Sequence, residues 1–289
     1  MFTNRSLTHE SGQALVQVAL SMLVLLAFVA LATDVGSLYA ERRKMQNAAD
    51  AGALAGAMVL CRDGEAAART LALSTALANG AQLQVADITI DLANGLVSVP
   101  VSTTGQSIFA RLMNPSFATT PVRAKATAKC GPISTAGGGL FPIAIENFGW
   151  ITDTTYDLLQ VPGPGNFSWL SWNGENNAPY LRDEIIGKEN PSPPVSIGDW
   201  VQGLTGATNS HDIRTALSNL VGKTIIILVY DTVRAQGAGF DYHVVGFAAF
   251  SVEETDPPKT LIGKFVKMTS SYTSTGGSNY GVYGARLTQ

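Results

Sequence analysis

A long uncharged run near the N-terminus constrains this chain more than any other feature. Residues 11–33 carry no ionisable side chain, and only Gln17 and Ser21 interrupt the apolar residues between Ala14 and Ala32. About 20 such residues are enough for a helix to cross the hydrocarbon core of a bilayer. The sequence predicts a retained transmembrane helix over residues 14–33.

The predicted helix does not stop at the membrane. Beyond Asp34 the chain stays rich in Ala, Leu, Glu, Arg, Lys and Gln, which are good helix formers, and no proline precedes Pro100. An unbroken helix from Ala14 to Leu60 would be about 70 Å long. We therefore expect a membrane stem that runs directly into a projecting helix.

The same stretch resembles a known family. It contains a Gly, an Ala-Leu-Val sequence, the apolar run, Asp-Val-Gly, a Tyr, paired Arg residues and Gln-Asn-Ala-Ala-Asp-Ala. This pattern resembles the N-terminal segment of TadE/TadG-like proteins of Flp pilus assembly. The resemblance implies a membrane-anchored, pilin-related component of a Tad-type pilus or secretion machine that is not an enzyme. Its expected partners are the membrane and other Tad/Flp pilus or pseudopilin subunits and assembly proteins.

The matching residues beyond the apolar run form the predicted assembly segment. The alternative is that they only solvate a membrane-proximal helix and contact no partner. They are Asp34, Gly36, Tyr39, Arg42, Arg43, Gln46, Asn47 and Asp50.

Processing and orientation remain open at the sequence level. Related pseudopilins are cut after a Gly with a Glu five residues on, but Gly12 is followed at that position by Gln17. A neutral amide cannot pair with a new α-amino group, so cleavage after Gly12 stays an alternative to an intact N-terminus. A count of Lys and Arg would place the N-terminus outside. Long C-terminal domains translocate largely regardless of nearby charge, and the resemblance implies a cytoplasmic N-terminus. We therefore expect residues 1–13 to be cytoplasmic and the bulk of the chain to be extracytoplasmic, anchored in the bacterial inner membrane.

Small residues recur along the projecting helix. Ala49, Gly52 and Gly56, together with Met45, form a stripe along which another backbone can approach closely. The stripe either packs against a partner helix in an assembly or covers the protein's own sheet.

Residues 34–130 are predicted to form a pilin-like unit in which a long helix precedes a small antiparallel sheet. After a break at Cys61–Gly64 and a second helix, Ala93-Asn94-Gly95 predicts a hairpin turn, and Phe117–Cys130 alternates as a half-buried strand. Pro100 should end the second hairpin strand or lie at an edge. In an oxidising compartment Cys61 and Cys130 could form a disulfide, the alternative being two unrelated buried thiols.

A glycine-rich segment at residues 131–139 is expected to link this unit to a β-rich domain over residues 140–289, giving an α+β fold. Strands are expected at Leu140–Glu146, Thr224–Tyr230 and His243–Val252, with 261–268 and 280–287 completing the same sheet. Residues 231–239 are expected to form a loop and 212–220 a short helix.

The search for chemistry finds little. The net charge of −3 and the 14% of charged residues give no basis for binding nucleic acid. We expect no cofactor and no metal. Two alternatives stay open: an adhesive or carbohydrate-binding protein using Trp169 and Trp172 near Phe167, and a membrane-tethered hydrolase using His243 beside Asp241.

Overall fold

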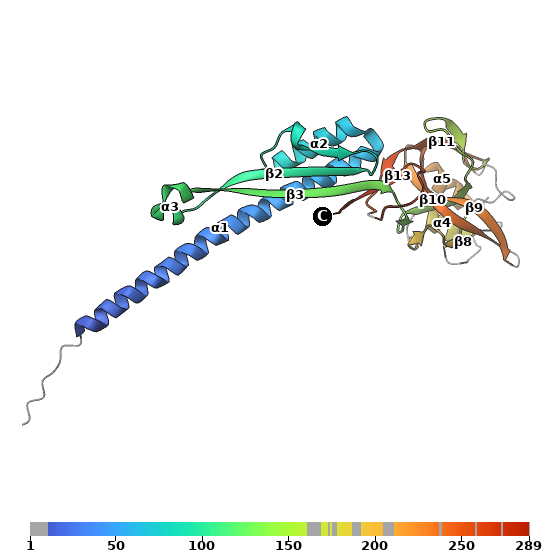
Figure 1. The fold of residues 1–289 in the computed structure, drawn as a ribbon. Helices are drawn as coiled ribbons and strands as arrows, with labels where there is room; N and C mark the ends of the chain where they lie inside the picture. Colours follow the sequence, from blue (N-terminus) through green and yellow to red (C-terminus); the bar gives the residue numbers. More distant parts are fainter. Residues whose placement is uncertain are drawn as a thin grey trace, which may run out of the picture.

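One helix, α1 (Ser11–Asp63), organises the molecule and projects far beyond the other elements (Figure 1). Its 53 residues correspond to about 80 Å. The computed structural model describes residues 11–160, 169–172, 174, 178–186, 192–204, 211–236, 239–257, 259–272 and 274–288. The expected unbroken helix through Asp34 to Leu60 is confirmed.

The projecting part of α1 is apolar and has no protein around it. Leu15, Leu23 and Phe28 are each more than 60% exposed. Among the described residues, α1 is the one helix long and apolar enough to cross a membrane, with a mean hydropathy of 2.6 in its most apolar window. A surface of this kind is stable in lipid and not in water.

The second half of α1 packs on a helix and a sheet, forming the first core. α2 (Glu65–Ala78) runs back along α1 after a turn at Gly64, whose φ of 86° lies in the region that favours glycine. The strands of this part are β1 (Thr89–Asp91), β2 (Leu96–Gln106) and β3 (Thr119–Pro132), and short helical turns η1 (Val85–Asp87), α3 (Ala110–Met113) and η2 (Pro115–Phe117) lie between them.

The expected antiparallel strands are confirmed in this part. β1 and β2 form the hairpin around Gly95, and β3 buries Val122, Ala126 and Ala128 on one side, as its alternation predicts. Pro100 does not end β2. It lies beyond the last residue that β1 pairs, so the missing N–H falls on the edge of the sheet.

The disulfide is confirmed between Cys61 and Cys130, whose Cα atoms are 6.1 Å apart. It joins the last turn of α1 to the end of β3. Because both cysteines are paired, the alternative of two unrelated thiols does not hold.

The C-terminal strand differs from expectation. β13 (Val282–Leu287) does not complete the sheet of the C-terminal region but pairs antiparallel with β3, and β12 (Met268–Thr269) pairs parallel with β13. The first sheet thus has five strands in the order β1-β2-β3-β13-β12. The strand expected at residues 280–287 therefore forms, but its partner is the free edge of β3 and not the sheet of the C-terminal region.

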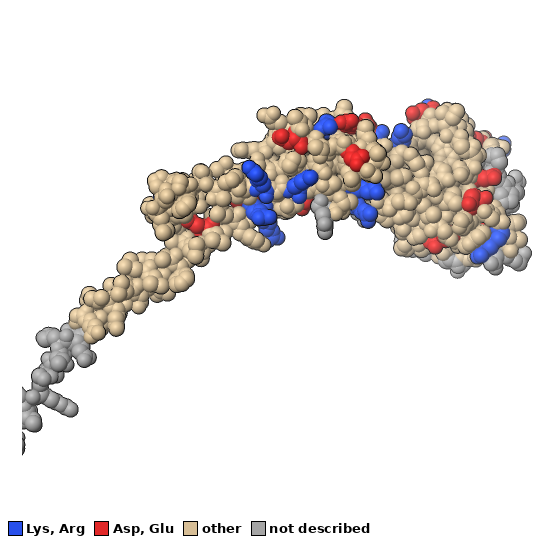
Figure 2. All heavy atoms as spheres, in the orientation of Figure 1, with Lys and Arg blue, Asp and Glu red and all other residues tan. Residues whose placement is uncertain are grey.

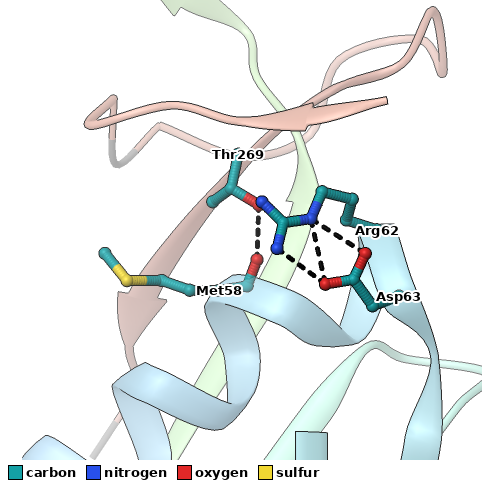
Figure 3. Close-up of polar contacts among 4 residues, drawn as sticks. All are labelled: Met58, Arg62, Asp63 and Thr269. Carbon is teal, nitrogen blue, oxygen red and sulfur yellow. Dashed lines mark hydrogen bonds and ion pairs between the residues drawn. The ribbon is translucent and has the colours of Figure 1, made fainter. Parts of the chain in front are cut away.

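A side-chain contact also ties this returning segment to the end of α1 (Figure 3). The Thr269 hydroxyl donates to the main-chain carbonyl of Met58, which holds β12 against the end of α1 opposite to the apolar stem. Within the last turn of the helix, Arg62 forms an ion pair of 2.7 Å with Asp63.

The head is built on a six-stranded sheet in the order β5-β9-β10-β11-β6, with β8 pairing β10. β5 and β9 are parallel and the other pairs are antiparallel. The elements of the head are β4 (Thr135–Ala136), β5 (Leu140–Glu146), β6 (Thr155–Asp157), α4 (Ala178–Ile186), β7 (Val195–Ser196), β8 (Trp200–Gln202), α5 (His211–Ser218), β9 (Thr224–Gln236), β10 (Gly239–Asp256) and β11 (Thr260–Val266).

Both faces of this sheet are covered. Ile227 and Val229 of β9 pack with α4 and α5 on one face, while Leu228 and Tyr230 join a second cluster on the other face. An uninterrupted apolar run is the pattern expected of such a strand. The long apolar helix followed by a β-rich part with mixed sheets is an α+β architecture, as predicted.

The expected loop at 231–239 is wrong. β9 continues to Gln236 and pairs with β10 from Gly239 onward, so the two strands form one long hairpin. Most of residues 231–235 are exposed, so the segment lacks the buried apolar pattern by which a strand is recognised in a sequence. Main-chain pairing with the opposite strand, and not burial, extends it.

A buried carboxyl group in α4 gives a prediction about pH. Glu184 is 6% exposed and accepts a hydrogen bond from the main-chain N–H of Trp172 at 3.0 Å. Burial raises its pKa from 4.5 to about 7, although that hydrogen bond acts in the opposite direction. The folded state therefore holds this proton more tightly than the unfolded chain does.

Stability is expected to fall as the pH rises from about 4.5 to above 7, because ionisation then opposes folding. The expected loss is about 3 kcal/mol. Glu184→Gln should remove this dependence and be the more stable form at about pH 8. Denaturant unfolding at low and high pH measures it, with the exposed Glu254→Gln as control, and an unchanged pH profile in Glu184→Gln would contradict the assignment.

Candidate assembly surface on the long helix

Apart from Asp34, the predicted assembly segment lies on the side of α1 opposite to the packing stripe. At about 100° per residue, positions three and four apart share a face of the helix. The buried side carries Asp34, Met45, Ala49, Gly52 and Gly56. The outward side carries Gly36, Tyr39, Arg42, Arg43, Gln46 and Asn47, with Asp50 half-buried at its border.

The packing stripe is covered by the chain itself. A Cβ atom on Gly52 would lie 3.0 Å from the carbonyl oxygen of Ala72, and one on Gly56 would lie 3.0 Å from the side chains of Ala72 and Val97. Met45 and Ala49 are fully buried in the same core. The sequence allowed the stripe to pack either against a partner helix or against the protein itself. In the structure it packs against the protein's own helix and sheet.

Asp34 differs from the other members of the assembly segment because it faces its own chain. Its carboxylate accepts hydrogen bonds from the main-chain N–H groups of Ile108 at 2.8 Å, Phe109 at 3.0 Å and Ala110 at 2.7 Å. Desolvation acts to raise the pKa of Asp34, but these donors and nearby Arg111 hold it below its ordinary value.

The position of Asp34 in the sequence signalled such a partner. A carboxylate directly after an apolar span is costly unless it is paired, so this signal could have predicted a partner, although Asp34 was predicted only as a member of the assembly segment. The sequence did not say which segment would supply the donors, because they come from 74 or more residues away.

Most of the outward face is free of the described protein, although the Gln46 side chain also donates to the main-chain carbonyl of Lys125 at 3.4 Å. Tyr39 is 70% exposed, Arg43 and Asn47 are exposed, and nothing lies within 4 Å of a Cβ atom built on Gly36. Gln46 donates to Asp50 at 2.8 Å along the helix. This face therefore presents an aromatic ring, a cation and amides to a partner, with an open backbone at Gly36.

A basic groove borders the outward face. Arg42 and Gln46 of α1 line it together with Arg123 and Lys125 of β3. Figure 2 shows basic side chains gathered just beyond the uncharged length of the helix. The arginines of α1 were predicted as part of the assembly segment, whereas the basic side of β3 was not predicted as part of any site. The alternation of β3 nevertheless places Arg123 and Lys125 on one solvent-facing side of the strand.

Comparison with protein families decides what this helix resembles. Residues 12–59 match the family described as putative Flp pilus-assembly TadE/G-like. The Tad-matching segment lies entirely within α1, and it contains both the apolar stem and the outward face. The resemblance seen in the sequence is thereby confirmed for this segment. A search of the curated proteins and a search of the solved structures give no match.

The match supports a role related to Flp/Tad pilus assembly, and together with the membrane-competent helix it suggests a single-pass membrane protein with membrane and pilus-assembly partners. Gly12, the candidate cleavage site, is exposed at the beginning of α1. Arg5 and His9, the basic side chains on the N-terminal side of the span, lie outside the described residues.

The polar pair expected in the head is different from the one that forms. His243 Nδ1 lies 2.7 Å from Asp231 of the neighbouring strand, whereas Asp241 pairs with Arg234 at 3.1 Å. Antiparallel pairing places these cross-strand neighbours within reach. Within the described parts of the chain, no group of three or more His, Cys, Asp or Glu could hold a metal ion.

Trp169 and Trp172 of the carbohydrate-binding alternative differ in exposure. Trp169 is 4% exposed and packs against Phe141 with ring centroids 6.1 Å apart, so its ring is not available to stack on a sugar. Trp172 is partly buried in the second cluster of the head and lines a surface pocket with Trp200. Phe167 lies outside the described residues.

Proposed function

We propose that this protein is a membrane-anchored, pilin-related structural or assembly component of a Tad/Flp-type pilus or secretion system. The observation that carries the proposal is the outward face of the Tad-matching segment. Tyr39, Arg43 and Asn47 are exposed there on a helix whose other side is fully used by its own fold. An exposed face on a rigid helix is suited to contact neighbouring subunits.

The mechanism is geometric and not catalytic. Residues 14–33 anchor the chain in the bacterial inner membrane, residues 1–13 face the cytoplasm and the bulk of the chain is extracytoplasmic. The pilin-like unit of residues 34–130 holds the outward face next to the membrane, and residues 131–139, which include the end of β3 and all of β4, lead into the head. The disulfide between Cys61 and Cys130 fits an oxidising exterior.

Complementation of a deletion strain tests this function. A strain lacking the protein should lose surface pili or Tad-dependent secretion, and the wild-type gene should restore them. The double variant Tyr39→Ala/Arg43→Glu is expected to abolish restoration, because it removes the aromatic ring and reverses the charge at the centre of the face. Pili in sheared fractions, electron microscopy and secreted protein are the measurements.

A charge reversal elsewhere is the matched control. Arg214→Glu changes an exposed arginine of α5 in the head and should restore piliation fully. Both variants must fractionate with the membrane and contain the disulfide. Normal piliation and secretion in the deletion strain, or in the strain carrying Tyr39→Ala/Arg43→Glu, would contradict the proposal.

A further inference from the structure

The tip of the β2–β3 hairpin is unusually apolar for an exposed turn. Between Gln106 and Thr119 its one charged residue is Arg111. Its large apolar side chains are exposed to different degrees: Ile108 51%, Phe109 38%, Leu112 77%, Met113 88% and Phe117 56%. Soluble proteins rarely leave such a cluster exposed to water, and an exposed apolar patch of this kind marks a contact with a protein or a membrane.

This tip is fixed at one level of the long helix. The hydrogen bonds from the three N–H groups of residues 108–110 to Asp34 join α3 to α1 one residue beyond the uncharged stem. Leu38 contacts the hairpin as well, since a Cβ atom on Gly105 would lie 2.6 Å from its side chain. Figure 1 shows α3 at the far end of the hairpin, beside α1.

The apolar tip is continuous with the apolar surface of the stem. On α1, Leu31 is 62% and Val35 is 56% exposed at the same level. If residues 14–33 fill the hydrocarbon core of about 30 Å, Asp34 lies at its boundary, and the tip lies in the interface between acyl chains and headgroups.

The charges nearby suit this position. Arg42 and Arg43 lie about 12 Å farther along the helix than Asp34, where basic side chains attract anionic headgroups. Arg111 within the tip has an aliphatic stem that can lie in the apolar layer while its guanidinium reaches the headgroups. The carboxylate of Asp34 is supplied with donors by the tip itself, so it does not oppose contact with lipid.

We propose that the hairpin tip of residues 107–118 is a second membrane contact, which inserts its apolar side chains into the bilayer interface beside the stem. Together the two contacts would fix the tilt and rotation of α1, and hence the direction in which the outward face points. This inference rests on the membrane anchor of the proposed function.

Nitroxide accessibility of the full-length protein tests the proposal. The protein is placed in nanodiscs of phosphatidylethanolamine and phosphatidylglycerol, and single cysteines are introduced and labelled without reductant so that the native disulfide persists. Leu112→Cys and Met113→Cys report on the tip. Leu23→Cys reports on the stem. Leu92→Cys, in the β1–β2 turn, is the matched control, because Leu92 is as exposed as Leu23.

Labels at positions 112 and 113 are expected to collide with oxygen in preference to a water-soluble nickel chelate, as a label at 23 does. Their oxygen-to-nickel ratio should be several-fold higher than that at position 92. A ratio at 112 and 113 equal to that at 92 would overturn the proposal while the label at 23 still confirmed the anchor. Protection from both reagents would also overturn it, because a protein would then cover the tip. Exposure of position 23 to the nickel chelate would overturn the anchor and the tip contact together.

Discussion

Replacing Cys61 and Cys130 together by serine is expected to lower the free energy of unfolding by about 4 kcal/mol. The bridge closes a loop between residues 69 apart in the sequence, and in the chain-entropy model its removal enlarges the unfolded ensemble accordingly. It also releases the last turn of α1 from the end of β3. Denaturant unfolding of the full-length protein in detergent, followed by far-UV circular dichroism, measures the change.

Reduction of the wild-type protein is the control for this prediction. Reduced wild type and the double serine variant should unfold at the same denaturant concentration, because both lack only the cross-link. An equal midpoint for the oxidised wild type and the variant would show that the bridge does not stabilise the fold.

Gly56→Leu is expected to destabilise the protein by about 3 kcal/mol or more. The first atom of the new side chain would already lie 3.0 Å from Ala72 and Val97 and 3.1 Å from the carbonyl oxygen of Ala68. A leucine would have to push α1 away from α2 and β2, and backbone cannot move aside as a flexible side chain can. Denaturant unfolding under the same conditions measures the loss.

Gly36→Leu is the matched control, since it makes the same chemical change in the same helix. Nothing lies within 4 Å of a Cβ atom there, and leucine is the better helix former by up to about 1 kcal/mol. Its stability should equal or exceed that of the wild type. Equal stability of Gly56→Leu and Gly36→Leu would mean that the stripe is not packed on the protein's own core.

Much of the fold near the membrane followed from local pattern. The span, the unbroken helix beyond Asp34, the hairpin at Gly95 and the alternating strand β3 are all set by composition, by turn residues or by periods of a few residues. These signals act between neighbours in the chain, so a sequence contains them directly. The tertiary structure only changed their boundaries, as when β2 passed through Pro100.

The residues of the candidate site could be predicted from the sequence, but the side of the helix on which each of them lies could not. The resemblance placed Asp34 and Tyr39 in one segment, whereas the structure turns Asp34 inward to α3 and leaves Tyr39 exposed. Which side of a helix is free depends on what packs against it, and here that is a hairpin formed much later in the chain.

The apolar stem, its continuous helical extension and the residue types on this extension all follow from the amino-acid sequence, because helix formation and transfer into lipid depend on adjacent side chains. The pairing of β13 with β3, the pairing of His243 with Asp231 and the position of the apolar hairpin tip beside Asp34 arise only in the folded chain. Those pairings join segments far apart in the chain, and their selection depends on edges and surfaces that exist only after the rest has folded.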